Sequence, residues 1–195
     1  MTAARLVVLV SGNGSNLQAV LDGCASGELD AQVVAVISDR PDAFGLERAR
    51  GANIPAIVHE KSPMQDRAKY DTELAAVVAS FEPDWIVLAG WMRLLTTNLL
   101  DQFPGRVVNL HPALPETFPG THAIERAFSA YQRGEIAHTG VMVHLVPDEG
   151  IDSGPVLAME VVSIQPSDTL ETLEARVHAT EHRLLVTTLN SLVTH

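Results

Sequence analysis

A single cysteine, Cys24, occurs among the 195 residues of this chain. One cysteine excludes an intrachain disulfide framework and a cysteine-based metal cluster, so we interpret Cys24 as a small buried helix residue. Long hydrophobic runs are also missing, because no apolar stretch reaches the roughly 18 residues of a membrane span. The apolar segment 6–10 is too short for the core of a signal peptide. We therefore expect a cytoplasmic protein with no membrane partner.

Positive charge is scarce as well, since 13 Lys and Arg stand against 24 Asp and Glu, giving a formal net charge of −11. Such an acidic chain is not expected to bind nucleic acid. Small anionic ligands would need a local device, such as a helix N-terminus or a few arginines. The expected partners are therefore small-molecule substrates. The length suits one domain, expected to act as a monomer or a homodimer.

Apolar segments alternate with segments of helical spacing along the first half of the chain. The predicted strands are Arg5–Val10, Val33–Ser38, Ala56–Val58, Trp85–Ala89 and Arg106–Leu110, and the predicted helices between them are Asn16–Ser26, Ala43–Arg50 and Gln65–Ser80. Continuous apolar strands separated by helices predict an α/β fold, with a mostly parallel sheet and helices on both faces.

The second half has a different pattern. It contains a predicted helix over Thr121–Arg133, two strands over Thr139–Val146 and Val156–Ile164, and a terminal helix over Asp168–Leu192. Because the two strands are joined by one short segment, they predict an antiparallel C-terminal extension of the sheet. Asp168 and Glu171 are spaced as in a capping box at the start of the terminal helix.

The segment Ser11–Asn16, Ser-Gly-Asn-Gly-Ser-Asn, follows the first predicted strand and opens the first predicted helix. Two glycines permit a tight turn, and the N–H groups of the loop and helix start form an anion site typical of phosphate binding. The alternative is a glycine turn with a capped helix. Asp39 ends the second predicted strand, where nucleotide-binding proteins hold ribose hydroxyls, so an NAD-dependent oxidoreductase is a second functional hypothesis.

Asn109 and His111 lie two residues apart at the end of a predicted strand, so their side chains point to the same face. Pro112 favours an extended conformation at His111, which preserves that pairing. An amide donor beside an imidazole is suited to stabilising an oxyanion at a carbonyl, and Asn109→Ala is then expected to lower the rate by at least about 10²–10³ with little change in folding. The alternative is a strand-end Asn and a His packed under a loop.

Two loop segments are further site candidates. Asp148–Pro155 joins the two late strands, and an Asp152 folded back near His111 would orient the imidazole and favour its protonated form. A solvated acidic turn is the alternative. Gly90–Leu95 follows the fourth predicted strand, and its Trp, Met and Leu side chains with Arg93 suit an aromatic, anionic ligand. The alternative is that these apolar side chains belong to the hydrophobic core and that Arg93 is an ordinary surface residue.

The histidines carry no helical zinc motif, so no metal is expected. His178 and Glu181 lie three residues apart on the terminal helix and share one face, as a solvated pair would. A non-catalytic ligand-binding module remains a third hypothesis, beside an enzyme of carbonyl chemistry and an oxidoreductase.

Taken together, these segments resemble the phosphoribosylglycinamide formyltransferase family, the folate-dependent formyltransferases of purine synthesis, from about Arg5 to Leu189. The matching pieces are Ser11–Gln18, Ala43–Arg50, Leu88–Leu95, Asn109–Pro112, Phe118–His122 and Gly150–Pro155. The resemblance implies a Rossmann-like formyltransferase fold in one domain, 1–195, with a phosphate-binding half (1–105) and a catalytic and folate-loop half (106–195).

The resemblance also implies the substrates and the site. The acceptor would be the amine of glycinamide ribonucleotide and the donor 10-formyltetrahydrofolate, with no metal. Catalytic roles would fall to Asn109, His111 and Asp152, and ribonucleotide binding to Gly12, Asn13, Gly14, Ser15, Asn16, His178 and Glu181. The folate site would include Arg67, Met92, Arg93, Leu94, Leu95, Asp148, Glu149, Gly150 and Ile151. Deformylases and methionyl-tRNA formyltransferases share part of this pattern and are the nearest alternatives.

Overall fold

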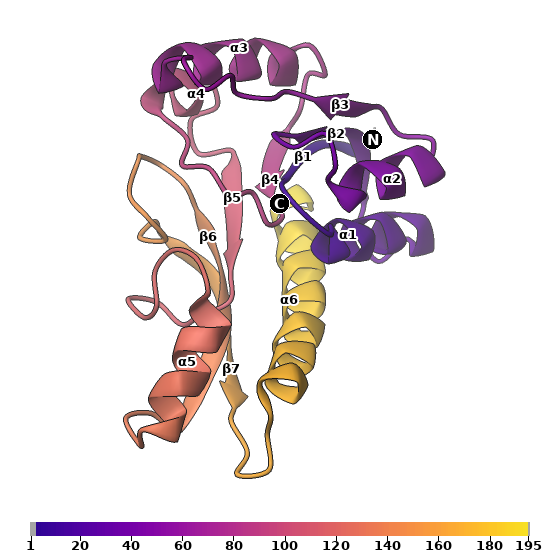
Figure 1. Cartoon of the computed structure of the whole chain (residues 1–195). Coiled ribbons are helices and arrows are strands. Elements are labelled where there is room, and N and C mark those ends of the chain that lie inside the picture. The colour runs from indigo at the N-terminus through magenta and orange to yellow at the C-terminus, as the bar shows by residue number, and fades with distance from the viewer. Residues whose placement is uncertain (1–2, 195) are drawn as a thin grey trace.

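The computed structural model describes residues 3–194 and is built on one seven-stranded sheet with helices on both faces (Figure 1). The strands are β1 (Ala4–Val10), β2 (Ala31–Ser38), β3 (Ala56–Val58), β4 (Trp85–Leu88), β5 (Val107–His111), β6 (His138–Leu145) and β7 (Val156–Ser163). Their order across the sheet is β3-β2-β1-β4-β5-β6-β7. The pairings from β3 to β5 are parallel and those of β6 and β7 antiparallel, which confirms the predicted mixed sheet.

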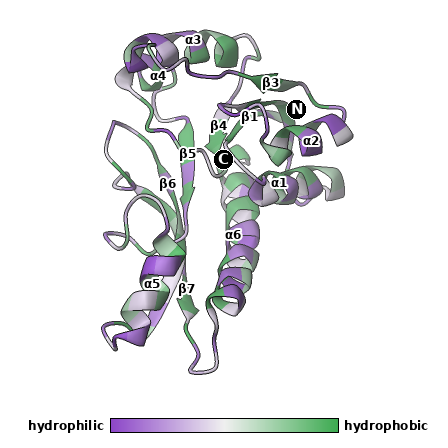
Figure 2. Cartoon of the chain, in the orientation of Figure 1, coloured by the Kyte–Doolittle hydropathy of each residue, from purple (hydrophilic) through white to green (hydrophobic). Residues whose placement is uncertain are grey.

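The helices are α1 (Ser15–Ser26), α2 (Phe44–Gly51), α3 (Arg67–Ala79), α4 (Thr97–Leu100), α5 (Ala123–Gln132) and α6 (Leu170–Val193). Hydrophilic and hydrophobic stretches alternate along α5 and α6 in Figure 2, as expected for helices with one buried face. Within residues 3–194, no helix is both long enough and apolar enough to cross a membrane.

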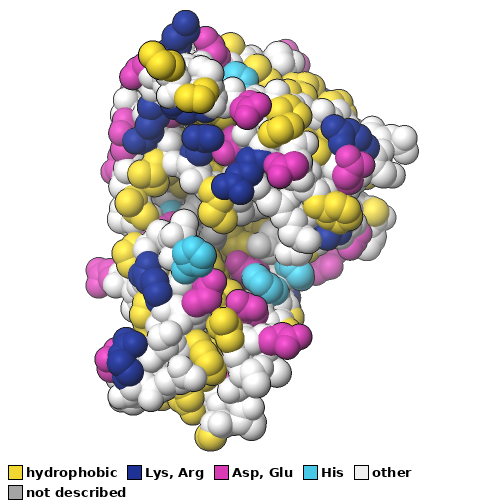
Figure 3. Space-filling model, in the orientation of Figure 1, with side chains coloured by type: hydrophobic (Ala, Val, Ile, Leu, Met, Phe, Trp, Pro, Cys, Tyr) yellow, Lys and Arg dark blue, Asp and Glu magenta, His cyan; other side chains and the backbone are white. Residues whose placement is uncertain are grey.

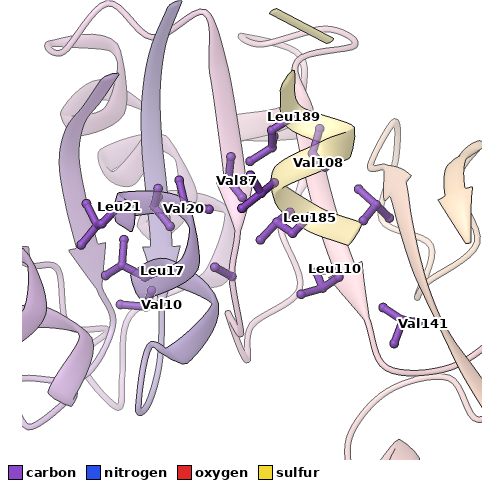
Figure 4. Packing of buried hydrophobic residues seen from close by; sticks show 14 of the residues in the cluster. Val10, Leu17, Val20, Leu21, Val87, Val108, Leu110, Val141, Leu185 and Leu189 are labelled. Carbon is purple, nitrogen blue, oxygen red and sulfur yellow. The ribbon is translucent and has the colours of Figure 1, made fainter. Parts of the chain in front are cut away.

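The core has two halves, one on each face of the sheet. Leu6, Val8 and Val10 of β1 point to the face covered by α1 and α6, whereas Val7 and Leu9 point to the face covered by α3 and α4. Figure 4 shows the first of these layers, in which side chains of α1 and α6 meet those of the central strands. Because both faces of β1 are buried, its sequence is continuously apolar rather than alternating.

Several predicted boundaries were wrong by a few residues; the helix predicted over Gln65–Ser80, for example, is α3, Arg67–Ala79. The short helix α4 was not predicted, because four residues are too few to show helical periodicity. At the start of α6 the capping box is formed by Thr169 and Thr172, whereas Asp168 forms an ion pair with Arg176 at 2.7 Å. Cys24 lies on α1 as predicted, but it is only half-buried.

The strand order places two loops side by side. The chain leaves β1 toward β2 on one side, while β4 lies on the other side, so the sheet reverses its winding between β1 and β4. Ligands of open α/β sheets bind in the crevice beyond the carboxyl ends of the strands at such a point. The loops that follow β1 and β4 are the predicted phosphate loop and the segment Gly90–Leu95.

Candidate active site

A cavity of about 460 Å³ opens beyond the carboxyl ends of β4 and β5, and most of the predicted site residues line it. Those lining it are Asn16, Met92, Arg93, Leu94, Leu95, Asn109, His111, Asp148, Glu149, Gly150, Ile151, Asp152, His178 and Glu181. Gly12, Asn13, Gly14, Ser15 and Arg67 lie outside the lining. Histidine and acidic side chains gather around the hollow in the middle of the face seen in Figure 3.

The end of β5 presents Asn109 and His111 to one face of the sheet, as their spacing predicts. The neighbouring residues Val108 and Leu110 point to the opposite face, into the core layer of α1 and α6. In the antiparallel pairing with β6, Asn109 lies opposite His144 and His111 lies opposite Met142. Helices α3 and α4 pack against the same face of the sheet at its other end.

Asp152 lies at the centre of the site and joins three segments of the chain. Its Oδ1 accepts a hydrogen bond from Asn109 Nδ2 at 3.0 Å, and its Oδ2 accepts one from the Gly120 N–H at 2.8 Å. The same Oδ2 lies 3.3 Å from His111 Nδ1, so the folded-back Asp152 predicted from the sequence is present. Asp152 adopts a left-handed backbone, with φ of 49°, a conformation that is costly unless surrounding contacts hold it.

His111 is buried between two acceptors. Its Nδ1 faces Asp152, and its Nε2 lies 3.2 Å from the Phe118 carbonyl oxygen. As predicted, the Asp152 carboxylate favours the protonated form of His111, but burial of the imidazole has the larger, opposite effect. Burial lowers the pKa of His111 below its ordinary value, and the opposing effects of the Asp152 carboxylate and the Phe118 carbonyl are smaller.

Asp152 itself is ionised. Burial raises its pKa, but the imidazoles of His144 and His111 and the Gly120 N–H together lower it more, leaving the pKa below its usual value. A carboxylate that is held ionised and surrounded by donors is a fixed negative charge beside Asn109 and His111.

His144 is one of the lining residues, with Gly120 and His122, that were not predicted as site residues from the sequence. Its Nδ1 donates to the Leu145 carbonyl at 2.8 Å, so its Nε2 is free to accept from Asn109 Nδ2 at 3.1 Å. Both N–H groups of Asn109 are thus engaged, one by Asp152 and one by His144. The signal was present in the sequence: an apolar strand, Val141 to Val146, is interrupted by one buried histidine.

The glycine loop after β1 is held against α2. The Gly45 N–H donates to the Gly12 carbonyl at 3.1 Å, and a Cβ at Gly14 would lie 2.7 Å from the Gly45 Cα. Arg48 of α2 donates from Nε to the Asn13 carbonyl and from Nη2 to Asn13 Oδ1, both at 2.9 Å. Helix α2 therefore fixes the shape of this loop and supplies the cation nearest to it.

We expect Gly14→Ala to destabilise the protein by about 2–4 kcal/mol, since a left-handed alanine costs roughly 1–2 kcal/mol and the added methyl collides with the α2 backbone. Gly14 has φ of 74°. Gly27 is the matched control, because it has φ of 80° but open space around its missing side chain. Urea unfolding should therefore show a markedly smaller loss for Gly27→Ala. Equal losses of stability in the two variants would show that the contact of Gly14 with α2 does not contribute to stability.

At the other end of the cavity, His178 and Glu181 of α6 form an ion pair, with Nδ1 and Oε2 2.5 Å apart. The hydrogen bond to Glu181 raises the pKa of His178, although burial opposes the shift. Glu181 is buried, whereas about half of the His178 side chain is exposed. The helical spacing predicted one shared face, and the structure turns that face toward the cavity.

The segment Gly90–Leu95 and the acidic loop form an apolar wall. Met92, Leu94 and Ile151 are 58%, 42% and 48% exposed, which is high for large apolar side chains beside a cavity. At the outer edge, Glu149 accepts from the Thr97 N–H at 3.1 Å and lies 3.7 Å from Arg67 Nη2. Arg67 therefore sits at the rim of the wall rather than inside the cavity.

The oxidoreductase hypothesis is not supported by the surroundings of Asp39. Its Oδ1 accepts from Ser11 Oγ at 2.6 Å, its Oδ2 accepts from Arg93 Nε at 2.7 Å, and only 3% of the residue is exposed. A carboxylate so engaged does not reach ribose hydroxyls. Across the described residues, no group of three or more His, Cys, Asp or Glu side chains is placed to hold a metal ion.

Comparisons with known proteins agree with this geometry. Residues 4–189 match the family described as formyl transferase. Phosphoribosylglycinamide formyltransferase of Schizosaccharomyces pombe is 44% identical over 203 residues, with 98% of each chain covered. The Escherichia coli protein of the same name is 41% identical, covering 92% of this chain and 82% of the relative. The crystal structure of glycinamide ribonucleotide transformylase 1 from Symbiobacterium toebii superposes with a TM-score of 0.92 at 38% identity, covering 99% of this chain and 89% of that one.

Proposed function

This chain belongs to the formyl transferase family, and we propose that its cavity transfers the formyl group of 10-formyltetrahydrofolate to the amine of glycinamide ribonucleotide. The products are formylglycinamide ribonucleotide and tetrahydrofolate, and the reaction is a step of purine synthesis. Relatives that carry this activity in their names match the chain over nearly its whole length. The observation that carries the proposal is the Asn109–Asp152–His111 arrangement, which lines the same cavity as the apolar wall and the His178–Glu181 pair.

The wall Gly90–Leu95 fits a folate-type donor. Exposed apolar side chains suit a flat ring system, and the indole Nε1 of Trp91 is buried without a hydrogen-bond partner. Met92, Leu94 and Ile151 would contact the ring, while Asp148, Glu149 and Gly150 close one side of the cavity. Arg67 at the rim would meet the anionic tail of the donor. The bound donor supplies the electrophilic formyl carbon.

The ribonucleotide would lie across the opposite end, with its phosphate toward the loop Gly12–Asn16 and its amine toward Asn109. The N–H groups of this loop and the start of α1 favour an anion. The buried Oδ1 of Asn16 has no hydrogen-bond partner, so it is available to accept from a substrate hydroxyl or amine. His178 lies at the same end, and its hydrogen bond to Glu181 raises its pKa and so favours the charged imidazole.

The residues of the chain act on charge and protons at the formyl group. As the amine attacks, negative charge develops on the formyl oxygen, and Asn109 Nδ2 is the amide donor placed to bind it. That developing charge raises the pKa of neighbouring His111 and so favours the protonated imidazole as a second donor. Ionised Asp152 holds both donors in place. It also lies on the path by which a proton leaves the attacking nitrogen for the leaving one.

The pH dependence of ribonucleotide binding should follow His178. Its pKa is raised above the ordinary value of about 6.5, so the imidazole is charged below the raised pKa and loses its charge as pH rises through it. The KM for glycinamide ribonucleotide should therefore increase with pH across that range. We expect His178→Gln to raise this KM by about tenfold at pH 6.5 and to flatten its pH profile. His138→Gln, at the exposed start of β6, is the control and should leave this KM unchanged. An unchanged KM in His178→Gln would show that His178 does not bind the ribonucleotide.

A spectrophotometric assay of formyl transfer tests the proposed function directly. Purified protein is mixed with 10-formyltetrahydrofolate, with and without glycinamide ribonucleotide, and formation of the folate product is followed by absorbance. We expect turnover only when both substrates are present. Turnover without the ribonucleotide indicates a deformylase instead, and absence of turnover with both contradicts the proposal.

A further inference from the structure

Asp39, at the end of β2, is a buried carboxylate that the mechanism does not use. It belongs to neither loop of the cavity, yet its two oxygens bind one residue from each. Oδ1 accepts from Ser11 Oγ at 2.6 Å and Oδ2 accepts from Arg93 Nε at 2.7 Å. Because only 3% of Asp39 is exposed, solvent cannot replace either partner.

Ser11 extends this contact to the backbone of the donor wall. Its Oγ donates to Asp39 and accepts from the Met92 N–H at 2.9 Å, while its own N–H donates to the Gly90 carbonyl at 3.1 Å. Ser11 is also the residue from which the phosphate loop starts. One carboxylate therefore joins the carboxyl ends of β1, β2 and β4.

The side chain of Arg93 contacts two buried residues, Asp39 and Tyr70. Its Nε binds Asp39, and its guanidinium carbon lies 5.6 Å from the ring centre of Tyr70, which is buried on α3. The Tyr70 hydroxyl in turn donates to the His59 carbonyl at 2.7 Å. The sequence suggested that Arg93 binds the donor, but its guanidinium already has a buried counter-ion and an aromatic ring beneath it.

We propose that Asp39 is a positioning residue for the donor subsite, and that Arg93 acts through Asp39 rather than by binding the donor itself. Asp39 fixes where Arg93 lies, and with Ser11 it fixes the backbone of Met92 through Leu95, whose apolar side chains form the wall. This inference rests on the proposed function, because it assigns the wall to a folate-type donor.

A double-mutant cycle between Asp39→Asn and Arg93→Gln tests this inference. The Kd of folic acid is measured by titration calorimetry, together with KM for the formyl donor and kcat. Each single variant should raise Kd and KM about tenfold while kcat changes less than about threefold. In the double variant, Kd and KM should also rise about tenfold rather than about a hundredfold, because both substitutions break the same contact.

A merely structural carboxylate would behave differently. It would lower the thermal unfolding temperature and the amount of folded protein, without a specific rise in the donor KM. Glu47→Gln is the matched control, because it removes one carboxylate of an exposed ion pair with Arg50 on α2. That variant should leave Kd and KM unchanged.

The outcomes separate this inference from the proposed function. Wild-type protein that binds no folic acid contradicts the proposed function, and this inference with it. Wild-type binding that Asp39→Asn leaves unchanged, or effects of the two substitutions that multiply, contradict this inference alone. If Asp39→Asn does not fold, the same cycle is run with Ser11→Ala and Arg93→Gln, and multiplying effects again overturn the inference.

Discussion

Asp152→Asn is expected to lower kcat for formyl transfer by about 10²–10⁴, the range that a positioned acid–base group contributes. The carboxylate accepts from Asn109 and Gly120 and faces His111, so every neighbour that touches it presents a donor. An asparagine there offers one acceptor oxygen and one amide nitrogen. Whichever way the amide is turned, its NH₂ group faces another donor, and the arrangement cannot be kept.

Two measurements separate loss of charge from loss of fold. Thermal unfolding shows whether the variant is folded, and an NMR titration follows His111. Because burial already lowers the pKa of His111 and the Asp152 carboxylate opposes that effect, its pKa should fall further in Asp152→Asn.

Asp101→Asn, an exposed residue at the end of α4, is the control and should change neither quantity. A folded Asp152→Asn variant with near-normal kcat, or with an unchanged His111 titration, would remove Asp152 from the catalytic role proposed for it.

The layers of the fold could be predicted from the sequence because both faces of the central strands are buried. Continuous apolar runs such as Arg5–Val10 indicate a covered parallel strand, and glycines such as Gly27 mark helix ends. The short helix α4 and the exact cap of α6 carry no comparable signal. Four residues show no periodicity, and neighbouring Asp168 and Thr169 both suit an N-cap.

The geometry of the predicted site residues follows from the sequence where local spacing decides it, and not where tertiary contacts decide it. The common face of Asn109 and His111 follows from the period of a strand. The partner of Asn109, His144, follows from an antiparallel register that the sequence does not specify. The charge of His111 depends on how deeply it is buried, and a nearby carboxylate alone does not predict that. Arg93 shows the same limit, since its partner Asp39 lies on a different strand.

Engagement of both N–H groups of Asn109 also has a consequence for catalysis. An amide held by Asp152 and by His144 cannot rotate, so its nitrogen is fixed before the substrate arrives. Such a donor needs no reorganisation when negative charge develops, and preorganised donors are the most effective ones. One of its two N–H groups must then be shared with the formyl oxygen, and the longer contact, to His144 at 3.1 Å, is the one we expect to yield.

Asn109→Ala is therefore expected to lower kcat by about 10²–10³, equivalent to about 3–4 kcal/mol of lost transition-state stabilisation. The unchanged folding predicted from the sequence is not expected. Truncation leaves His144 Nε2 without its donor and removes one of the hydrogen bonds to Asp152, at a cost of about 1–3 kcal/mol in stability.

The two effects are separable, because kcat reports on the transition state of folded molecules, whereas urea unfolding reports on the ground state. Asn98→Ala, which removes an exposed amide bonded to Thr72, should change neither by a measurable amount. His144→Phe removes the acceptor but keeps the Asn109 donor, so it should cost stability while kcat falls much less than in Asn109→Ala. Equal losses of kcat in the two variants would mean that Asn109 acts by holding the sheet together and not by binding the formyl oxygen.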